Sequence, residues 1–277
     1  RIASIVLAAG KGTRMKSKQP KVLHPICGKP MIRYAVDVAK SSGAESTVVV
    51  IGHGADAVKE YLGEAVQFAL QGDQLGTGHA VLAAKNAIDP DVVLVLITNG
   101  DMPLLTEHTL RELIETQKIN AGPLSLLTMV SDDSYGFGRI VRKEDGSVAA
   151  IVEEVQCTPE QLSIKELNVG AYCMDARWLW EVLPQLPLSP KGEYYLTDVV
   201  GIAVQIGLKV AAIKMKDHQD ALGINTRVHL AEAEALMQKR ILERHMLNGV
   251  TVINPDSTYV EDSVEIGEEY VVIDGLK

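Results

Sequence analysis

The chain has 277 residues, of which 47% are hydrophobic, and it carries a formal net charge of −9. This length and apolar content suffice for one large α/β domain, or for one domain with an appendage. The negative charge argues against a nucleic-acid-binding surface, and no apolar run approaches the length of a membrane span. Cys27, Cys157 and Cys173 are widely separated, which is typical of reduced thiols and predicts a cytoplasmic protein.

Short apolar runs alternate with amphipathic segments along the first half of the chain. The predicted strands are Ser4–Leu7, Thr47–Ile51, Val66–Leu70, Val92–Thr98 and Leu124–Val130, and the predicted helices are Met31–Ser42, Ala55–Leu62, Gly78–Ala87 and Thr106–Gln117. Such alternation predicts an α/β fold with a mostly parallel, doubly wound sheet covered by helices on both faces. Between residues 139 and 214 short strands mix with helices, and we expect this part to extend the sheet.

The last fifty residues follow a different pattern. A long helix is predicted from about residue 226 to residue 248, with Asn225 or Thr226 as its N-cap. Beyond it, aliphatic residues are spaced along the chain, and Val272 stands six residues after Ile266, which is the repeat of a parallel β-helix. One or two coils are too few for a stable solenoid, and a single terminal hairpin is the alternative. The chain is therefore predicted to comprise three parts, at residues 1–225, 226–248 and 249–277.

A glycine-rich loop follows the first predicted strand. It reads LAAGKGTRM from Leu7 to Met15, and Lys21 stands seven residues after Arg14. Small residues let the backbone approach a ligand closely, backbone N–H groups can cradle phosphate oxygens, and Arg14 and Lys21 add positive charge. The run lacks the spacing of an NTPase phosphate-binding loop, and Met15 stands where the dinucleotide fingerprint needs its third glycine. The loop predicts a polyphosphate site, with an ordinary strand-to-helix turn as the alternative.

Three chemically suited residues follow or end predicted strands, namely Gly10, Gln71 and Asp101. Ligands of open α/β sheets bind beyond the carboxyl ends of the strands, so we expect these residues along one edge. Asp101, preceded by Gly100, is the best carboxylate candidate for a metal ion, although an aspartate in this position is often only a cap or turn former.

Several longer segments resemble those of a known enzyme family. LAAGKGTRM followed by QPKVLHPICGKPM is similar to the signature of the nucleoside-diphosphate-sugar pyrophosphorylases. Further segments in the family's order are QGDQLGTGHA (71–80), NGDMPLL (99–105), YGFGRI (135–140), IVEE (151–154), ELNVG (166–170), GEYYLTD (192–198) and GINTR (223–227). More narrowly, the chain resembles the uridylyltransferase half of the bifunctional bacterial enzyme that makes UDP-N-acetylglucosamine, a precursor of peptidoglycan and lipopolysaccharide. The resemblance extends to about Asn248.

The resemblance implies a Mg²⁺-dependent, in-line transfer. UTP and N-acetylglucosamine-1-phosphate would give UDP-N-acetylglucosamine and pyrophosphate, with Arg14 and Lys21 as catalytic residues acting on phosphates. Asp101 and Asn225 would hold Mg²⁺, while a role of Asn225 as a plain N-cap is the alternative. Other readings are a related sugar-1-phosphate nucleotidyltransferase that uses another sugar or base, and a non-catalytic nucleotide-sugar sensor.

The same resemblance implies the residues that bind substrates. They are Leu7, Ala8, Ala9, Gly10, Gly12, Thr13, Lys21, Gln71, Gly76, Thr77, Asn99, Gly100, Asp101, Gly138, Glu153, Asn168 and Asn225, with Tyr195 and Thr197 near the sugar. Gln71 is expected to pair with the edge of the uracil, and Glu153 and Asn168 with sugar hydroxyls. Val155 and Gln156 depart from the family, which commonly has Lys-Asp there, so one phosphate contact is in doubt. His53 and His79, beside glycine turns, are interpreted as structural.

For the last residues the resemblance favours the start of a left-handed β-helix. In the bifunctional family that β-helix carries acetyltransferase activity and makes the full-length form a homotrimer. This chain stops before any acetyltransferase site, so we expect no such activity and a monomer.

Overall fold

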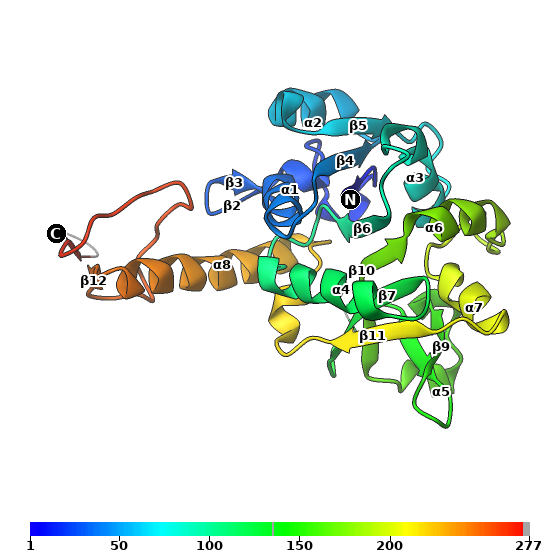
Figure 1. Ribbon diagram of the computed structural model, residues 1–277. Coiled ribbons are helices and arrows are strands. Elements are labelled where there is room, and N and C mark those ends of the chain that lie inside the picture. Colours follow the sequence, from blue (N-terminus) through cyan, green and yellow to red (C-terminus); the bar gives the residue numbers. More distant parts are fainter. Residues whose placement is uncertain (135, 274–277) are drawn as a thin grey trace.

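A mixed sheet of nine strands forms the centre of the part of the chain that the structure describes, residues 1–134 and 136–273 (Figure 1). Its strands in this computed structural model are β1 (Ile2–Ala8), β4 (Ser46–Ile51), β5 (Gln67–Leu70), β6 (Leu94–Asn99), β7 (Leu124–Val130), β8 (Arg139–Arg142), β9 (Val148–Val152), β10 (Glu166–Asp175) and β11 (Val210–Lys214). The order is β11-β7-β10-β6-β1-β4-β5, and β8 and β9 branch from β10. Only β10 and the β8–β9 pair run antiparallel to their neighbours, which confirms the mostly parallel α/β fold.

Helices cover both faces of this sheet. One face carries α1 (Met31–Ser41), α2 (Ala55–Leu62) and α4 (Glu107–Ile119), and the other carries α3 (Thr77–Ala83), α6 (Ala176–Val182) and α7 (Asp198–Gln205). Successive side chains of a strand point to opposite faces, and accordingly the neighbours Ile5 and Val6, both fully buried, belong to different cores. Strands buried on both sides are the reason why the sequence shows continuous apolar runs here.

Most predicted bounds agree with the structure to within two residues. The strand Leu124–Val130 and the helix Ala55–Leu62 are found as predicted. The predicted helix Gly78–Ala87 is split, because α3 ends at Ala83 and a 3₁₀ turn covers Lys85–Ala87. Asp89, which precedes Pro90, is biased away from helical geometry, so helical structure is not expected to continue much beyond this turn. The remaining short helices are α5 (Pro159–Leu162) and the 3₁₀ turns Thr13–Met15, Lys21–Leu23, Gly63–Ala65, Glu154–Gln156, Leu183–Gln185 and His218–Ala221.

A 21-residue helix, α8 (Arg227–Leu247), extends away from the sheet (Figure 1). Its N-cap is Thr226, whose side chain accepts a hydrogen bond from the backbone N–H of His229 at 3.2 Å. This leaves the side chain of Asn225 available for other contacts. None of the described helices, α8 included, combines the length and apolar character needed to cross a membrane.

Beyond α8 the chain turns back and packs along the helix. Strands β12 (Thr251–Val252) and β13 (Val271–Val272) pair in parallel, so the hairpin alternative, which requires an antiparallel pair, is wrong. Val250 and Val260 belong to the same buried hydrophobic cluster as Met237 and Ile241 of α8. A single parallel pair does not make a solenoid, so the β-helix stays a prediction, and residues 274–277 of that predicted part lie outside the described residues.

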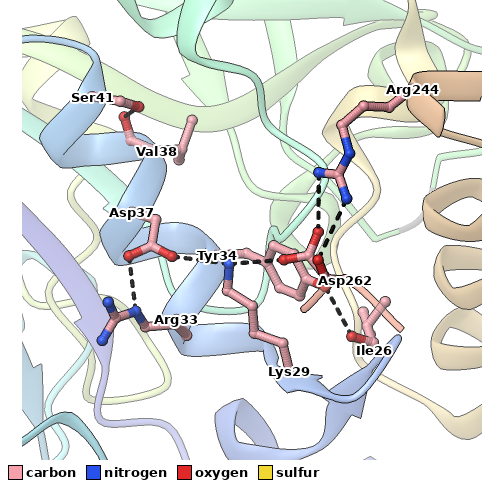
Figure 2. A network of polar contacts seen from close by, with 9 residues as sticks. All are labelled: Ile26, Lys29, Arg33, Tyr34, Asp37, Val38, Ser41, Arg244 and Asp262. Carbon is pink, nitrogen blue, oxygen red and sulfur yellow. Dashed lines mark hydrogen bonds and ion pairs between the residues drawn. The ribbon is translucent and has the colours of Figure 1, made fainter. Parts of the chain in front are cut away.

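Polar contacts fasten this C-terminal segment to the sheet domain. A short hairpin of β2 (Pro25–Ile26) and β3 (Lys29–Pro30) lies between them. Figure 2 shows Asp262 between two cations, with Lys29 Nζ at 3.1 Å and Arg244 at 3.5 Å. Lys29 Nζ also lies 3.0 Å from Asp37 of α1, and the N–H of Asp262 donates to the carbonyl of Cys27 at 2.9 Å. The hairpin is therefore held from the sheet side and from the C-terminal side at once.

Candidate active site

A cavity of about 370 Å³ lies at the carboxyl ends of the central strands. Strand β1 is flanked by β4 on one side and by β6 on the other, so the chain order reverses here, which is where open α/β sheets bind ligands. The cavity is lined by Leu7, Ala8, Ala9, Gly10, Lys11, Lys21, Val22, Gln71, Gln74, Gly76, Thr77, Ala80, Asn99, Asp101, Glu193 and Tyr195. The structure thus brings together the three strand-end residues that the sequence predicts on one edge.

A second, smaller cavity of about 150 Å³ adjoins the first. Its lining includes Gly138, Glu153 and Asn168, which come from the part of the chain beyond β7. Three residues, Leu7, Thr77 and Asn99, line both cavities. The two cavities are therefore neighbouring parts of one site, which the sheet extension completes.

The glycine-rich loop forms one wall of the first cavity. Gly12 has a φ of +60°, and a Cβ there would lie 2.6 Å from Cβ of Lys21. A side chain at this position would be strained and would also push Lys21 away. Glycine at position 12 therefore lets the loop pack directly against Lys21.

One ammonium group joins three distant parts of the chain. Lys21 Nζ forms an ion pair with Asp101 Oδ2 and donates to Asn225 Oδ1 at 3.0 Å. The side chains of Lys21 and Asp101 are only 12% and 20% exposed, so solvent screens this pair less than a surface pair. The cluster unites the turn after the glycine-rich loop, the end of β6 and the segment before α8.

Backbone contacts fix the carboxylate in this cluster. The N–H of Ile224 donates to the carbonyl of Asp101 at 2.9 Å, which places Asn225 beside Asp101. The N–H of Gly100 donates to the carbonyl of Leu7 at 2.9 Å, and a Cβ on Gly100 would lie 2.7 Å from Ile32. A side chain before Asp101 would therefore crowd the tip of Ile32 on helix α1.

The loop after β5 is tied to a segment far along the chain. The N–H of Gly78 donates to the carbonyl of Tyr194 at 2.8 Å, and Thr77 Oγ1 accepts from the N–H of Leu196 at 2.9 Å. Gly76 has a φ of +98°, and a Cβ there would lie 2.6 Å from the carbonyl oxygen of Tyr194. Two of the segments that suggested the family resemblance, LGTGHA and GEYYLTD, therefore hold each other in place.

The second cavity offers hydrogen-bonding groups of defined orientation. Thr197 Oγ1 donates to Glu153 Oε1 at 2.8 Å, and Asn168 Nδ2 donates to the buried hydroxyl of Tyr172 at 2.8 Å. Burial raises the pKa of Glu153 above its ordinary value, the Thr197 hydroxyl opposes this shift, and the carboxylates of Asp198 and Glu193 add to it. Burial also raises the pKa of Tyr172, so its hydroxyl stays protonated.

Some residues expected at the site lie outside its walls. The described residues that line the two cavities include Lys11 but not Arg14, Gly12 or Thr13. Arg14 and Thr13 are exposed on the 3₁₀ turn that follows the loop, and Lys11 is exposed at the rim of the cavity. Val155, one of the two departures from the family, is 63% exposed.

Sequence reasoning missed some lining residues. Gln74 Nε2 donates to the carbonyl of Ala9 at 2.7 Å and so bridges the loop after β5 to the glycine-rich loop. Its place in the segment QGDQLGTG is a signal that could have revealed it. Tyr172 was missed because an aromatic residue in an apolar strand gives no sign of a polar role. Glu193 was missed as well, although it stands two residues before Tyr195.

The Lys21 cluster also has the donor set that a divalent cation requires. The oxygens of Asp101 and Asn225 converge on a single positive group, which shows that both can reach one point. One carboxylate and one amide oxygen are hard ligands of the kind that Mg²⁺ binds, with water and substrate phosphates as the others. The described residues offer no cluster of three or more His, Cys, Asp and Glu side chains for another kind of metal site.

Comparisons with known proteins agree with this fold. Residues 4–137 match the family of MobA-like NTP transferase domains. The bifunctional protein GlmU of Caldanaerobacter subterraneus subsp. tengcongensis is 45% identical over 275 residues, which is 99% of this chain and 60% of that protein. GlmU of Brevibacillus brevis is 47% identical over 276 residues, with the same two shares. The chain thus spans about 60% of the length of the curated relatives that it matches.

A solved structure supports the fold independently. It is named as a putative glucose-1-phosphate thymidylyltransferase from Bacillus anthracis and superimposes with a TM-score of 0.68 at 21% identity, covering 85% of this chain and 95% of the other. Together these findings show that the chain is similar to the bifunctional GlmU proteins along nearly its whole length, and that it shares its fold with the solved structure.

Proposed function

We propose that the chain transfers a uridylyl group from UTP to N-acetylglucosamine-1-phosphate, giving UDP-N-acetylglucosamine and pyrophosphate. One observation carries the proposal: Lys21, Asp101 and Asn225 converge beside two cavities that share Asn99. A cavity for a nucleotide, a second one for a sugar and a charged cluster beside them are what a nucleotidyl transfer needs. The similarity to GlmU proteins over 99% of the chain favours this pair of substrates.

The reaction requires the protein to overcome charge repulsion. An oxygen of the sugar phosphate forms a bond to the α-phosphorus of UTP while the bond to the bridging oxygen breaks and pyrophosphate leaves. Two unit charges 4 Å apart repel by about 4 kcal/mol at an effective dielectric constant of about 20. Several such pairs would prevent the approach, so fixed cations and alignment are the main requirements. Lys21, held at the cavity wall, supplies positive charge at the α-phosphate or at the sugar phosphate.

The remaining residues orient the substrates in this proposal. The backbone of Leu7–Gly10 and Gly76–Thr77 lies against the nucleotide, and Gln71 pairs with the base edge. Gly138, Glu153 and Asn168 bind the sugar in the second cavity. Arg14 stabilises the leaving pyrophosphate in this proposal, and its exposed side chain is free to turn towards the phosphates.

Mg²⁺ is the cation we propose for Asp101 and Asn225, because a carboxylate and an amide oxygen are ligands that Mg²⁺ binds. When bound, such a cation neutralises phosphate charge and stabilises the charge that develops during transfer. The division into residues 1–225, 226–248 and 249–277, the monomeric state and the cytoplasmic location remain further predictions of this assignment.

The test is pyrophosphate release with UTP and Mg²⁺, comparing N-acetylglucosamine-1-phosphate, glucosamine-1-phosphate and glucose-1-phosphate. We expect a strong preference for the acetylated sugar and loss of activity on chelation. Preference for another sugar would overturn the proposed substrate but keep the reaction. No release with any sugar, together with tight uridine-nucleotide binding, would support a sensor instead.

A further inference from the structure

Gln71 stands in the first cavity with its amide group held in one orientation. The side chain is 4% exposed, and its nitrogen Nε2 donates to the carbonyl oxygen of Gly76 at 3.0 Å. A carbonyl can only accept, so the nitrogen and not the oxygen of the amide must face Gly76. The backbone on both sides of Gly76 is tied to Tyr194, whose N–H donates to the carbonyl of Leu75 at 2.8 Å and whose carbonyl accepts from the N–H of Gly78 at 2.8 Å. The first amide hydrogen of Gln71 is therefore bound to a backbone segment that is itself hydrogen-bonded on both sides.

The second amide hydrogen of Gln71 faces a histidine. Gln71 Nε2 lies 3.0 Å from Nδ1 of His79, in the first turn of α3. Because Nε2 is the donor, Nδ1 must be the acceptor, which requires a neutral imidazole that carries its proton on Nε2. His79 does not belong to the described lining of the cavity, so it can act on a ligand only through Gln71.

These two contacts determine which amide atom remains for a ligand. Both hydrogens on Nε2 are used, and Oε1 has no hydrogen-bond partner among the described residues. Since Gln71 lines the cavity, a base placed beside it meets an acceptor with no competing donor. The N3 position of uracil is a donor and suits that acceptor, whereas N3 of cytosine is itself an acceptor and is repelled.

We propose that His79 is a positioning residue that sets the base selectivity of the site by holding Gln71 with Oε1 towards the base. The inference rests on the placement of the base at Gln71 in the proposed function. It replaces the interpretation of His79 as merely structural. Without the acceptor at Nδ1, only the Gly76 contact opposes rotation of the Gln71 amide. A rotation that breaks this one contact presents Nε2–H to an incoming cytosine.

A matched pair of variants tests the acceptor itself. In His79→Asn the side-chain oxygen can occupy the place of Nδ1, and His79→Leu has a similar size without an acceptor. Binding of UTP and of CTP is measured by calorimetry for both variants and the parent, with His108→Asn and His108→Leu on the exposed surface of α4 as controls. A lost hydrogen bond of this kind changes an affinity ratio by about tenfold.

We expect His79→Leu to lower the ratio of UTP affinity to CTP affinity by about tenfold and His79→Asn to keep it within about twofold. An unchanged ratio in His79→Leu overturns the proposal, and so does an equal loss in both variants, because the acceptor would then be irrelevant. If the leucine variant does not fold, His79→Phe gives the same comparison with a ring. Binding is measured without sugar phosphate, so absence of turnover would count against the proposed function while leaving this test intact.

Discussion

Lys21 and Asp101 form an ion pair across 80 positions of the sequence, and Asn225 completes the same contact from a third segment. Neither partner is fully buried, yet both are mostly shielded from water. Removing one member leaves the other as an unpaired charge that is mostly shielded from water, which is unfavourable. This pair is therefore the point at which a small change should separate binding from turnover.

Asp101→Asn should abolish most turnover while leaving nucleotide binding. The variant keeps the size of the side chain but removes the charge that faces Lys21 and the proposed cation. We expect kcat to fall at least ~10²-fold, the size of effect seen when one transition-state contact is lost, and UTP affinity to fall by less than about tenfold. Pyrophosphate release and calorimetry give the two quantities.

Asp37→Asn is the control for that variant, since Asp37 also faces a lysine, Lys29, at 3.0 Å but lies away from both cavities. It should keep near-normal kcat. Equal kcat in Asp101→Asn and in the parent would contradict the metal assignment.

Gly12→Ala should damage activity more than stability alone explains. The φ of +60° costs an alanine about 1–2 kcal/mol, and the new Cβ would lie 2.6 Å from Cβ of Lys21. Gly207 follows the end of α7 with a φ of +78°, and the N–H of Leu208 donates to the carbonyl of Ala203 at 2.9 Å, as in a left-handed Schellman turn. A Cβ at Gly207 would meet no atom within 4 Å, so alanine there brings strain of the same kind without the clash. We expect both Gly12→Ala and Gly207→Ala to lower the melting temperature, but only Gly12→Ala to lower kcat/KM. Equal kcat/KM in the two variants would show that Lys21 does not depend on Gly12.

Glu153→Gln should stabilise the protein at neutral pH more than in acid. Burial, with the nearby carboxylates, raises the pKa of Glu153 above its ordinary value of 4.5. A carboxyl with a raised pKa in the folded state contributes its full stability below 4.5 and loses it as the pH rises through the raised value. Glutamine keeps the acceptor for Thr197 without the ionisation. Melting temperatures between about pH 4 and about pH 8 should therefore diverge with rising pH in favour of the variant, whereas the exposed Glu144→Gln should give a flat difference.

Asp262→Ala should loosen the β2–β3 hairpin selectively. Cys27 and Cys173 are both fully buried, and burial raises the pKa of each thiol to about 12, so neither should react with a thiol reagent at about pH 8 in the native protein. Loss of the partly exposed contacts of Asp262 with Lys29 and Arg244 amounts to about 1 kcal/mol, or about fivefold in the population of the opened state.

In a Cys157→Ser background, labelling of Cys27 should therefore accelerate about fivefold while Cys173 stays protected. Equal acceleration at both cysteines would indicate global unfolding and would contradict a local role. Asp132→Ala, which breaks an exposed pair with Lys165, is the matched control.

The strand-end residues could be predicted from sequence because parallel strands bring their carboxyl ends to one edge. Gly10, Gln71 and Asp101 needed only the position of each strand, and all three line one cavity. Other parts of the site needed contacts that periodicity cannot supply. The direction of β10 is one of them, because an antiparallel strand in a mixed sheet has the same apolar pattern as a parallel one.

Contacts between side chains that are distant in sequence were the other part of the site that could not be predicted. The contact of Asn225 with Lys21 joins residues 204 positions apart, and no local signal distinguishes it from the capping role that Thr226 takes instead. The contact of His79 with Gln71 escapes sequence reasoning for the same reason, since it joins two side chains and does not belong to a local turn. Arg14, by contrast, stands out in sequence, yet the structure leaves it exposed and outside the described lining of the cavity.

Helix α8 begins at Arg227, shortly after Asn225 of the charged cluster, and carries the C-terminal segment along its other half. At about 1.5 Å per residue its 21 residues span about 30 Å, and this length sets how far the C-terminal segment extends from the charged cluster. Each inserted residue would turn the distal segment by about 100° about the helix axis, and about seven would restore nearly the same heading. An insertion of about seven residues would still move the distal segment about 10 Å along the axis, so the contacts of Asp262 with Lys29 and Cys27 should be lost at every inserted length.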